Sequence, residues 1–243
     1  MDRGDYKNLL KTKQEHLNLV QQAMQRQGER GIIVFEGWDA AGKGSTIRRI
    51  AWCLDPRNLH VAAITAPTTL ELNGHWLKRF WTRIPSRGEI SIFDRSWYGR
   101  VLVERIEGFA SEAEWQRAYR EINEFEWSLA EEGYRIVKLF LDISPQTQLH
   151  RLKSRLETPA KSWKLTKEDI RNREQWGAYE QAYEDMMREC SPPHAPWHKV
   201  DANSKKEARL TCFDIILQRF GQGLDITPPP VDPDVSQYLK QAR

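Results

Sequence analysis

Short apolar runs alternate with longer amphipathic stretches along most of the chain. Five of these runs predict β-strands, at Ile32–Phe35, His60–Ile64, Glu89–Phe93, Ile136–Leu141 and His198–Val200. Between the runs, Ser111, Thr166 and Ser204 are each followed three positions later by an acidic residue, a capping-box pattern that predicts the start of a helix. Strands that alternate with helices indicate a doubly wound α/β fold with a mostly parallel five-stranded sheet. Ligands of such sheets bind at the carboxyl ends of the strands.

The two ends of the chain differ from this central pattern. Residues 1–30 predict a surface helix that precedes the main domain, because Leu9, Leu10, Leu17 and Val20 recur at helical spacing and Gly28 ends the pattern. The main domain is expected over residues 31–222. Residues 223–243 are expected to form an extended tail, because their proline-rich first half is incompatible with a helix interior or a central strand.

Charge and cysteine content narrow the class of protein. The chain has 37 Lys and Arg against 34 Asp and Glu, so it carries no overall signal for a polyanion such as nucleic acid. Basic residues gather locally, between Gln148 and Arg173 and again between Lys78 and Arg100. The three cysteines show no paired spacing, which is typical of reduced thiols in a cytoplasmic protein. No apolar run approaches membrane-spanning length, so we expect no membrane partner.

The most specific motif is the segment Gly37–Gly44, which follows the first predicted strand and precedes a helix-compatible run. It fits the P-loop pattern G-x-x-x-x-G-K, in which backbone N–H groups and a lysine, here Lys43, surround phosphate. Gly44 stands where Ser or Thr normally holds Mg²⁺, Ser45 lies one residue late, and Asp39 lies inside the loop. These departures are explained if Asp39 helps to hold the metal ion.

A second acidic residue, Asp94, ends the third predicted strand. In P-loop enzymes an acidic residue at this position holds Mg²⁺. The alternative is that Asp94 is an ordinary helix N-cap. Arg95 and Arg100 flank an aromatic pair directly after it, and guanidinium groups match phosphate oxygens well. We therefore favour a metal-binding role for Asp94 and phosphate contacts for the two arginines.

A basic segment at about residues 145–175 follows the fourth strand. Arg151 and Arg155 are four positions apart and share one face of a helix, and Lys161 and Lys164 follow a break at Pro159. The pattern favours a mobile helical lid that carries cations over transferring phosphates. The alternative is a surface helix with ordinary solvated charges.

Together these motifs resemble those of the polyphosphate kinase 2 family. The resemblance runs from about Gly31 to Phe220 and is carried by Gly37–Gly44, Phe93–Tyr98, Arg155–Pro159 and Trp163–Leu165, with further matches at Ala66–Thr68, Arg87–Ile90 and Ala195–Trp197. It implies a P-loop kinase fold similar to that of thymidylate kinase, with a helical lid. It also implies direct, Mg²⁺-dependent transfer of phosphoryl groups between inorganic polyphosphate and a purine nucleotide, without a phospho-enzyme, by a homo-oligomer such as a dimer or tetramer.

The resemblance also implies roles for individual residues. Asp39 and Asp94 would organise Mg²⁺, and Lys43, Arg95 and Arg155 would stabilise the transferring phosphoryl group. The remaining residues are expected to bind phosphate or nucleotide from the P-loop, the segment after the third strand and the lid, and they are Gly37, Gly42, Gly44, Ser45, Arg100, Arg151, Lys161 and Lys164.

The acceptor nucleotide is less well determined. The segments Ser96–Arg105 and Glu121–Phe125 look most like the AMP-phosphorylating branch of the family, whose members are often tandem duplications, whereas this chain has one copy. Thr158 and Ser162 depart from the Asp and Arg that are common in the lid motif. Phosphorylation of nucleoside diphosphates therefore stays open.

Two other functions fit parts of the pattern. An ATP-dependent nucleoside monophosphate kinase would share the lid arginines, but Gly44 and the Arg95–Arg100 segment fit it poorly. A non-catalytic module that binds polyanions or nucleic acid would use the basic clusters, but two acidic residues aimed at the anion argue against it. We therefore expect an enzyme with no nucleic-acid partner.

Overall fold

A parallel β-sheet forms the centre of the molecule in the computed structural model, which describes residues 2–242. Its five strands lie in the order β2-β3-β1-β4-β5, and all four neighbouring pairs are parallel. Their bounds are β1 Arg30–Gly37, β2 Leu59–Ala63, β3 Ile90–Asp94, β4 Tyr134–Asp142 and β5 Trp197–Asp201. The five predicted strands are confirmed, and the sheet is parallel throughout rather than mostly parallel.

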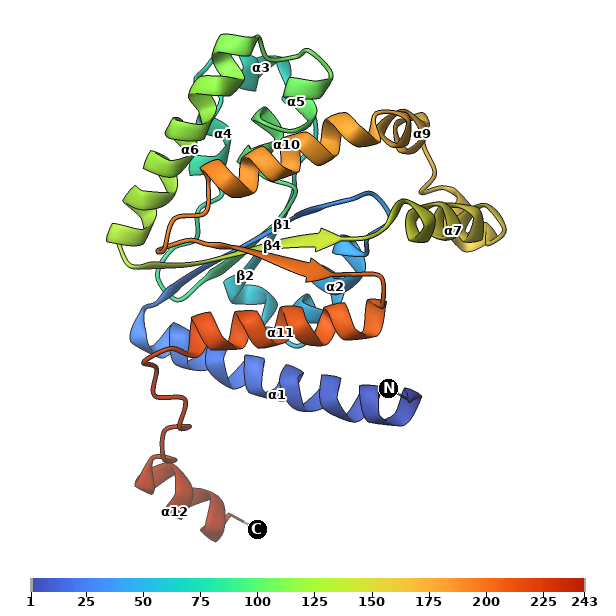
Figure 1. Ribbon diagram of the computed structural model, residues 1–243. Helices are drawn as coiled ribbons and strands as arrows, with labels where there is room; N and C mark the ends of the chain where they lie inside the picture. Colours follow the sequence, from blue (N-terminus) through green and yellow to red (C-terminus); the bar gives the residue numbers. More distant parts are fainter. Residues whose placement is uncertain (1, 243) are drawn as a thin grey trace.

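Helices cover both faces of this sheet. Figure 1 shows α1, α2 and α11 on one face, α4, α6 and α10 on the other, and α7–α9 beyond the carboxyl ends of the strands. The longer helices are α1 Arg3–Gln27, α2 Lys43–Ala51, α6 Glu112–Glu131, α7 Pro145–Leu156, α9 Lys167–Glu174, α10 Trp176–Glu189, α11 Lys205–Gly221 and α12 Pro233–Gln241. The shorter ones are α3 Thr69–Leu72, α4 Lys78–Trp81, α5 Val103–Ile106, α8 Pro159–Ser162 and the 3₁₀ turns η1 Pro56–Asn58 and η2 Trp97–Arg100.

The predicted helix starts are found where the capping boxes indicated. At the starts of α6 and α9, the N–H groups of Ser111 and Thr166 donate to Glu114 at 2.8 Å and to Asp169 at 2.9 Å, as in a capping box. Ser204 precedes α11, but its side chain makes no capping hydrogen bond. None of the described helices is both long and apolar enough to cross a membrane.

The hydrophobic core lies on both faces of β1 and β4. Residues 32–35 of β1 are completely buried, as expected for a central parallel strand covered on both sides. From one face α6 contributes Ile122 and Phe125, and from the other α11 contributes Phe213 and Ile216. Burial of each such side chain stabilises the fold by about 1.5–3 kcal/mol, so the sheet provides a rigid base for residues at its carboxyl edge.

A buried ion pair crosses this core. Lys138 of β4 is fully buried, and its Nζ donates to Glu126 Oε2 at 2.6 Å, to the Tyr98 hydroxyl at 2.8 Å and to the Cys190 carbonyl at 2.8 Å. Glu126 also accepts from the Trp97 indole at 3.0 Å. Because breaking such a pair leaves an uncompensated charge, it is costly to disrupt. The network therefore anchors η2, the segment that follows the end of β3, to β4 and α6.

The first helix lies on the outside of the molecule, and one stripe of its side chains belongs to the core. Leu17, Val20 and Met24 are completely buried, and α1 packs along α11. Leu9, by contrast, is exposed. The apolar spacing within residues 1–30 predicts the helix. Spacing alone does not reveal that this helix packs on α11 of the same chain.

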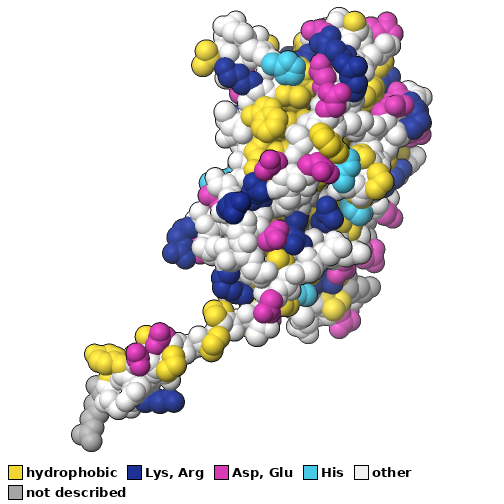
Figure 2. Space-filling model, turned by 90° about the vertical axis from the view of Figure 1, so that its left-hand side faces the viewer, with side chains coloured by type: hydrophobic (Ala, Val, Ile, Leu, Met, Phe, Trp, Pro, Cys, Tyr) yellow, Lys and Arg dark blue, Asp and Glu magenta, His cyan; other side chains and the backbone are white. Residues whose placement is uncertain are grey.

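The C-terminal segment is only partly extended. Residues 223–232 contain no helix or strand, but Pro233–Gln241 forms α12, contrary to the expectation of a tail without helix. Asp232 accepts hydrogen bonds from the N–H groups of Asp234 and Val235, and Pro233 takes the first helical position, where the missing N–H costs nothing. Figures 1 and 2 show α12 standing clear of the body, and its Tyr238 and Leu239 are exposed.

Candidate active site

The P-loop connects β1 to α2 through unusual backbone conformations. Gly37 has a φ of 128°, and a Cβ there would lie 2.3 Å from the Leu141 carbonyl oxygen, so only glycine allows β1 to pass this close to β4. Ala40 and Gly42 also have positive φ values, 62° and 118°. No side chain caps the start of α2 at Gly42. The loop therefore presents the amino end of a helix toward the cleft, which favours an anion.

Lys43 points back along this loop. Its Nζ donates to the carbonyl oxygens of Gly37 at 2.5 Å and Trp38 at 3.1 Å. Burial lowers the pKa of Lys43, and the nearby carboxylates of Asp39 and Asp94 oppose that shift. A phosphate oxygen in the cleft would give the ammonium a charged partner in place of these neutral carbonyls.

Asp39 is held by two donors from distant parts of the chain. Its Oδ1 accepts from Arg95 Nη2 at 3.3 Å, and its Oδ2 accepts from Asn172 Nδ2 of α9 at 2.8 Å. Burial alone would raise the pKa of Asp39, but Lys43 and Arg95 outweigh it and the net pKa is lowered. Asp39 is therefore ionised near neutral pH. The sequence offered no specific signal for Asn172.

Asp94 ends β3 beside the amino end of α2. No hydrogen bond or ion pair of its carboxylate is found within residues 2–242. A Cβ at Gly44 would lie 3.7 Å from Asp94 Oδ2, so glycine leaves the space next to this carboxylate open. Arg95 follows in the left-handed region, with a φ of 64°, and its N–H donates to the Phe35 carbonyl at 3.0 Å. Such strain in a non-glycine residue is typical of functional sites.

The two carboxylates suit Mg²⁺, which prefers oxygen ligands and is commonly held by one or two carboxylates together with phosphate oxygens. Asp94 is the better candidate for direct coordination, because both oxygens of Asp39 already accept hydrogen bonds. In the described part of the chain, no group of three or more acidic, His or Cys side chains could form a metal site by itself. The residues therefore fit a cation that is completed by its phosphate ligands.

The P-loop forms one end of a cleft of roughly 1040 Å³ whose walls include α7–α9 and the start of α11. The cleft brings together most of the predicted site residues, namely Asp39, Gly42, Lys43, Gly44, Ser45, Asp94, Arg95, Arg151, Arg155, Lys161 and Lys164. Arg155 lies 3.7 Å from Asp169 of α9. With few acidic side chains against many basic ones, the cleft is suited to a ligand with several negative charges.

A family model described as polyphosphate kinase 2 matches residues 1–224. The chain belongs to the polyphosphate kinase 2 family. It is 50% identical over 211 residues to a polyphosphate:AMP phosphotransferase of Pseudomonas aeruginosa, covering 86% of this chain but 42% of that protein. It is 40% identical to an ADP-polyphosphate phosphotransferase of the same organism, covering 90% of this chain and 71% of the relative. The chain thus spans less than half the length of this polyphosphate:AMP phosphotransferase.

Solved structures of the polyphosphate kinase 2 family share the fold. The crystal structure of a putative polyphosphate kinase 2 from P. aeruginosa matches with a TM-score of 0.88 and 47% identity, covering 91% of this chain and 47% of that one. Polyphosphate kinase 2 from Arthrobacter aurescens matches with a TM-score of 0.91 and 34% identity, covering 99% and 87%. The predicted α/β fold and the predicted family are confirmed.

Arg151 differs from its expected place among the phosphate-binding residues. It is buried, and its Nη1 donates to the carbonyls of Ala40 and Ala41 while its Nη2 donates to those of Ala202 and Asn203, at 2.7–3.1 Å. These bonds tie the P-loop to the loop between β5 and α11. Arg151 thus braces the P-loop from behind, with both terminal nitrogens already engaged.

Two expected residues, Gly37 and Arg100, do not line the cleft. Gly37 acts through the backbone, as its contact with β4 shows. Arg100 pairs with Glu104 at 3.1 Å and lies over the ring of Trp76, 5.1 Å from its centroid. The structure therefore places Arg100 between α5 and the segment before α4. Arg95 is the arginine of this segment that reaches the P-loop.

Sequence reasoning missed Lys205 and Arg209 of α11, which line the cleft. Burial in the cleft wall and the charges of nearby arginines lower the pKa of Lys205 to about 8. A signal for both residues was available, because the helix predicted from Ser204 follows the carboxyl end of the last strand. In a parallel sheet, that end is where ligands bind.

Glu36 was also missed. It is 5% exposed and its Oε1 accepts from the Ser96 hydroxyl at 2.8 Å. Burial raises the pKa of Glu36 to about 7, although Lys43 and Arg95 favour the charged form. A glutamate inside an otherwise apolar strand, directly before a P-loop, was the available signal. Its carboxyl group lies behind the two cations of the site.

An aromatic stack links the P-loop to the helices beyond the sheet edge. Trp38 and Trp176, at the start of α10, are stacked with ring centroids 3.5 Å apart and planes 5° apart. Trp38 Nε1 also donates to Asp142 Oδ1 at 2.9 Å. With the bond between Asn172 and Asp39, this stack couples the α9–α10 corner to the P-loop.

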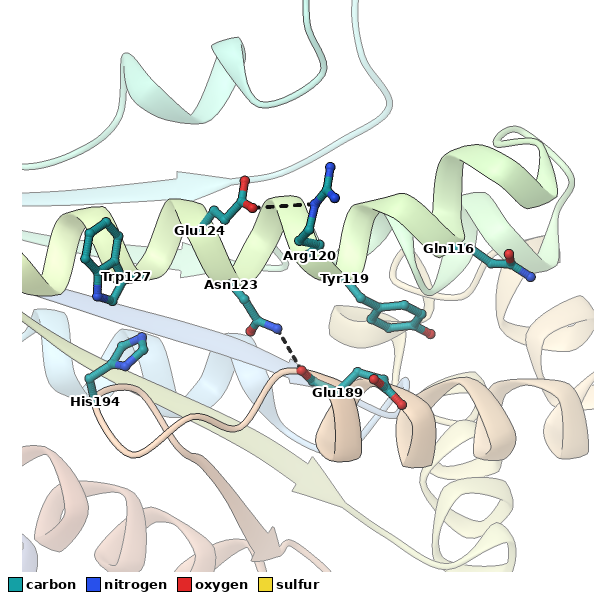
Figure 3. A pocket seen from close by; sticks show the side chains of 8 residues that line it. All are labelled: Gln116, Tyr119, Arg120, Asn123, Glu124, Trp127, Glu189 and His194. Atoms are coloured by element: carbon teal, nitrogen blue, oxygen red, sulfur yellow. Dashed lines mark hydrogen bonds and ion pairs between the residues drawn. The ribbon is translucent and has the colours of Figure 1, made fainter.

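A second hollow, of about 550 Å³, lies between α6 and the end of α10 (Figure 3). Asn123 donates to the Glu189 carbonyl at 2.8 Å, and Arg120 pairs with Glu124 at 3.5 Å. Its lining includes none of the P-loop, the strand-end carboxylates or the lid residues. This hollow therefore lacks the groups that suit the larger cleft to a ligand with several negative charges.

Proposed function

We propose that this chain transfers phosphoryl groups between inorganic polyphosphate and a purine nucleotide. The observation that carries the proposal is the convergence of Lys43, Arg95 and the carboxylates of Asp39 and Asp94 at one end of a long basic cleft. Phosphoryl transfer requires positioning and charge neutralisation more than covalent chemistry by the protein. The polyphosphate donors and acceptors in the names of the relatives agree with this assignment.

The residues take distinct roles in the proposed reaction. Lys43 and Arg95 bind oxygens of the transferring group, and Arg155 approaches it from α7. Asp94 is the principal Mg²⁺ ligand, and Asp39 holds Arg95 in place while it contributes to the metal environment. Mg²⁺ held by these carboxylates would neutralise charge on the phosphates during transfer. The transfer is in line, from donor to acceptor, without a covalent enzyme intermediate.

Helices α7–α9, about residues 145–175, form the lid in this proposal. Lys161 and Lys164 lie on the cleft, and the side chain of Trp163 between them is exposed. When polyphosphate binds, its charges draw these lysines inward and exclude water from the transferring group. The hydrogen bond between Asn172 and Asp39 connects this movement to the P-loop.

AMP is the proposed acceptor, with ADP as product. The relative that is 50% identical is named a polyphosphate:AMP phosphotransferase, although this chain spans 42% of its length. Relatives named for ADP and GDP are 40% and 34% identical. We also propose that the protein acts as a homo-oligomer in the cytoplasm.

Three substitutions test the roles directly. Lys43→Ala, Asp94→Asn and Arg155→Ala should each lower kcat at least about 100-fold, since each removes a group that contacts developing charge. Lys153→Ala is the matched control, because this exposed lysine lies on α7 outside the cleft. Turnover is measured with polyphosphate and AMP, by resolving nucleotides on an anion-exchange column. Near wild-type turnover of a variant with intact fold would remove that residue from the proposed mechanism.

A further inference from the structure

Helix α1 carries a stripe of polar side chains that form hydrogen bonds with the end of the P-loop helix, α2. Three amide side chains on one face of α1, spaced i, i+4 and i+7, meet backbone groups at and after the carboxyl end of α2. Gln14 donates to the Arg49 carbonyl at 2.9 Å and Asn18 to the Cys53 carbonyl at 2.8 Å. Gln21 both donates to the Asp55 carbonyl at 3.1 Å and accepts from its N–H at 2.7 Å. Helix α1 is thus fixed to α2 by hydrogen bonds as well as by packing.

Tyr6 extends this contact toward the cleft. It is 8% exposed, and its hydroxyl accepts from Arg209 Nη1 at 3.2 Å. A second arginine, Arg49 of α2, meets Arg209 at Ser45. Both arginines line the cleft and both reach Ser45: Arg209 Nη2 donates to the hydroxyl at 3.2 Å, and Arg49 Nη1 donates to the carbonyl at 2.9 Å. A buried hydroxyl of α1 therefore contacts one of two neighbouring arginines that reach the P-loop helix.

The two arginines lack a balancing carboxylate. Neither Arg49 nor Arg209 forms an ion pair with an acidic side chain within residues 2–242. Burial and the positive charge of Arg209 both lower the pKa of Arg49. Arg209 Nε is buried and has no hydrogen-bond partner among the described residues. Uncompensated guanidinium groups held side by side are suited to an anion with several phosphate groups.

We propose that Tyr6 is a positioning residue that holds Arg209 beside Arg49, where both arginines bind phosphates of the polyphosphate chain beyond the transferred group. This inference rests on the proposed function, because it takes polyphosphate as the ligand of the cleft. Tyr6 itself does not line the cleft and so acts only through the arginines. The role connects α1 to substrate binding through its contact with α11.

The test is Tyr6→Phe, which removes the hydroxyl and keeps the buried ring. The KM for long-chain polyphosphate should rise about 3- to 10-fold, the range that corresponds to loss of one hydrogen bond of ordinary net strength, while kcat and the KM for AMP stay within about twofold. Direct binding of long-chain polyphosphate, measured by calorimetry, should weaken by the same factor. The matched control is Tyr119→Phe, which deletes a hydroxyl that accepts from Arg105 at 3.1 Å away from the cleft.

A double-mutant cycle separates positioning from general destabilisation. If Tyr6 acts through Arg209, then Tyr6→Phe should have no further effect on the polyphosphate KM in an Arg209→Ala background. Unchanged polyphosphate binding in Tyr6→Phe, or a parallel loss of kcat and of both KM values, would overturn the inference. A wild-type protein that neither binds nor uses polyphosphate would instead overturn the proposed function.

Discussion

The buried carboxyl group of Glu36 should make the stability of the protein depend on pH. Its pKa is raised from 4.5 to about 7 in the folded protein, because burial disfavours the charged form. Between these values the folded state binds more protons than the unfolded state, so the free energy of unfolding falls as pH rises and stays low above pH 7. Taking about 1.4 kcal/mol per pKa unit, the full loss amounts to roughly 3 kcal/mol.

Glu36→Gln removes this titration with little change in shape. The amide oxygen of the new side chain can still accept from the Ser96 hydroxyl, which lies 2.8 Å from the present carboxylate oxygen. The buried NH₂ group costs about 1–3 kcal/mol if it finds no acceptor, but that cost does not depend on pH. The variant should therefore gain most of roughly 3 kcal/mol relative to the wild type when pH is raised from 5 to 8.

Urea unfolding curves at pH 5, 6, 7 and 8 measure this difference. For a chain of this length, each kcal/mol corresponds to about 2–4 °C in Tm, so thermal melts provide a second readout. Glu124→Gln, at an exposed position of α6, is the control and should show no relative change with pH. If the stabilities of Glu36→Gln and the wild type differ by the same amount at every pH, Glu36 does not titrate as described.

Two further predictions concern the P-loop and the basic cleft. Gly37→Ala should lower the free energy of unfolding by about 3 kcal/mol or more, because the added Cβ meets the Leu141 carbonyl at a φ of 128°. The control Gly108→Ala, in open space at a φ of 71°, should lower it by only about 1–2 kcal/mol. Chemical unfolding measures both values, and equal losses would contradict the close approach of β1 to β4. The KM for polyphosphate should rise above pH 8, because Lys205 loses its charge there. Lys205→Arg, measured in parallel, should abolish that rise. The same pH profile in both proteins would exclude Lys205 as a substrate-binding cation.

The fold and the central residues of the site could be predicted because they depend on local sequence. The strand runs around Ile32–Phe35 and Ile136–Leu141 are apolar enough to specify buried parallel strands. Lys43 follows the glycine-rich turn after β1, and Asp94 ends β3. Because the carboxyl ends of parallel strands lie at one edge of the sheet, both residues meet there.

The rest depends on contacts between distant segments, which local patterns do not encode. Arg151 was expected to bind phosphate, but its guanidinium group donates hydrogen bonds to four backbone carbonyls of two other loops. Asn172 reaches Asp39 across 133 positions of sequence, and Tyr6 reaches Arg209 across 203. The tail was predicted from its prolines alone, although a proline at a first helical position is compatible with α12.

The central claim is that polyphosphate is the phosphoryl donor. The most direct test is to incubate the protein with Mg²⁺ and AMP, offering either long-chain polyphosphate or ATP as the only donor, and to resolve the nucleotides by anion-exchange chromatography. We predict ADP from AMP with polyphosphate, lost in Lys43→Ala and Asp94→Asn. In parallel reactions, ADP and GDP are offered as acceptors with polyphosphate. The claim would be contradicted if ATP phosphorylates AMP while polyphosphate phosphorylates none of the three acceptors.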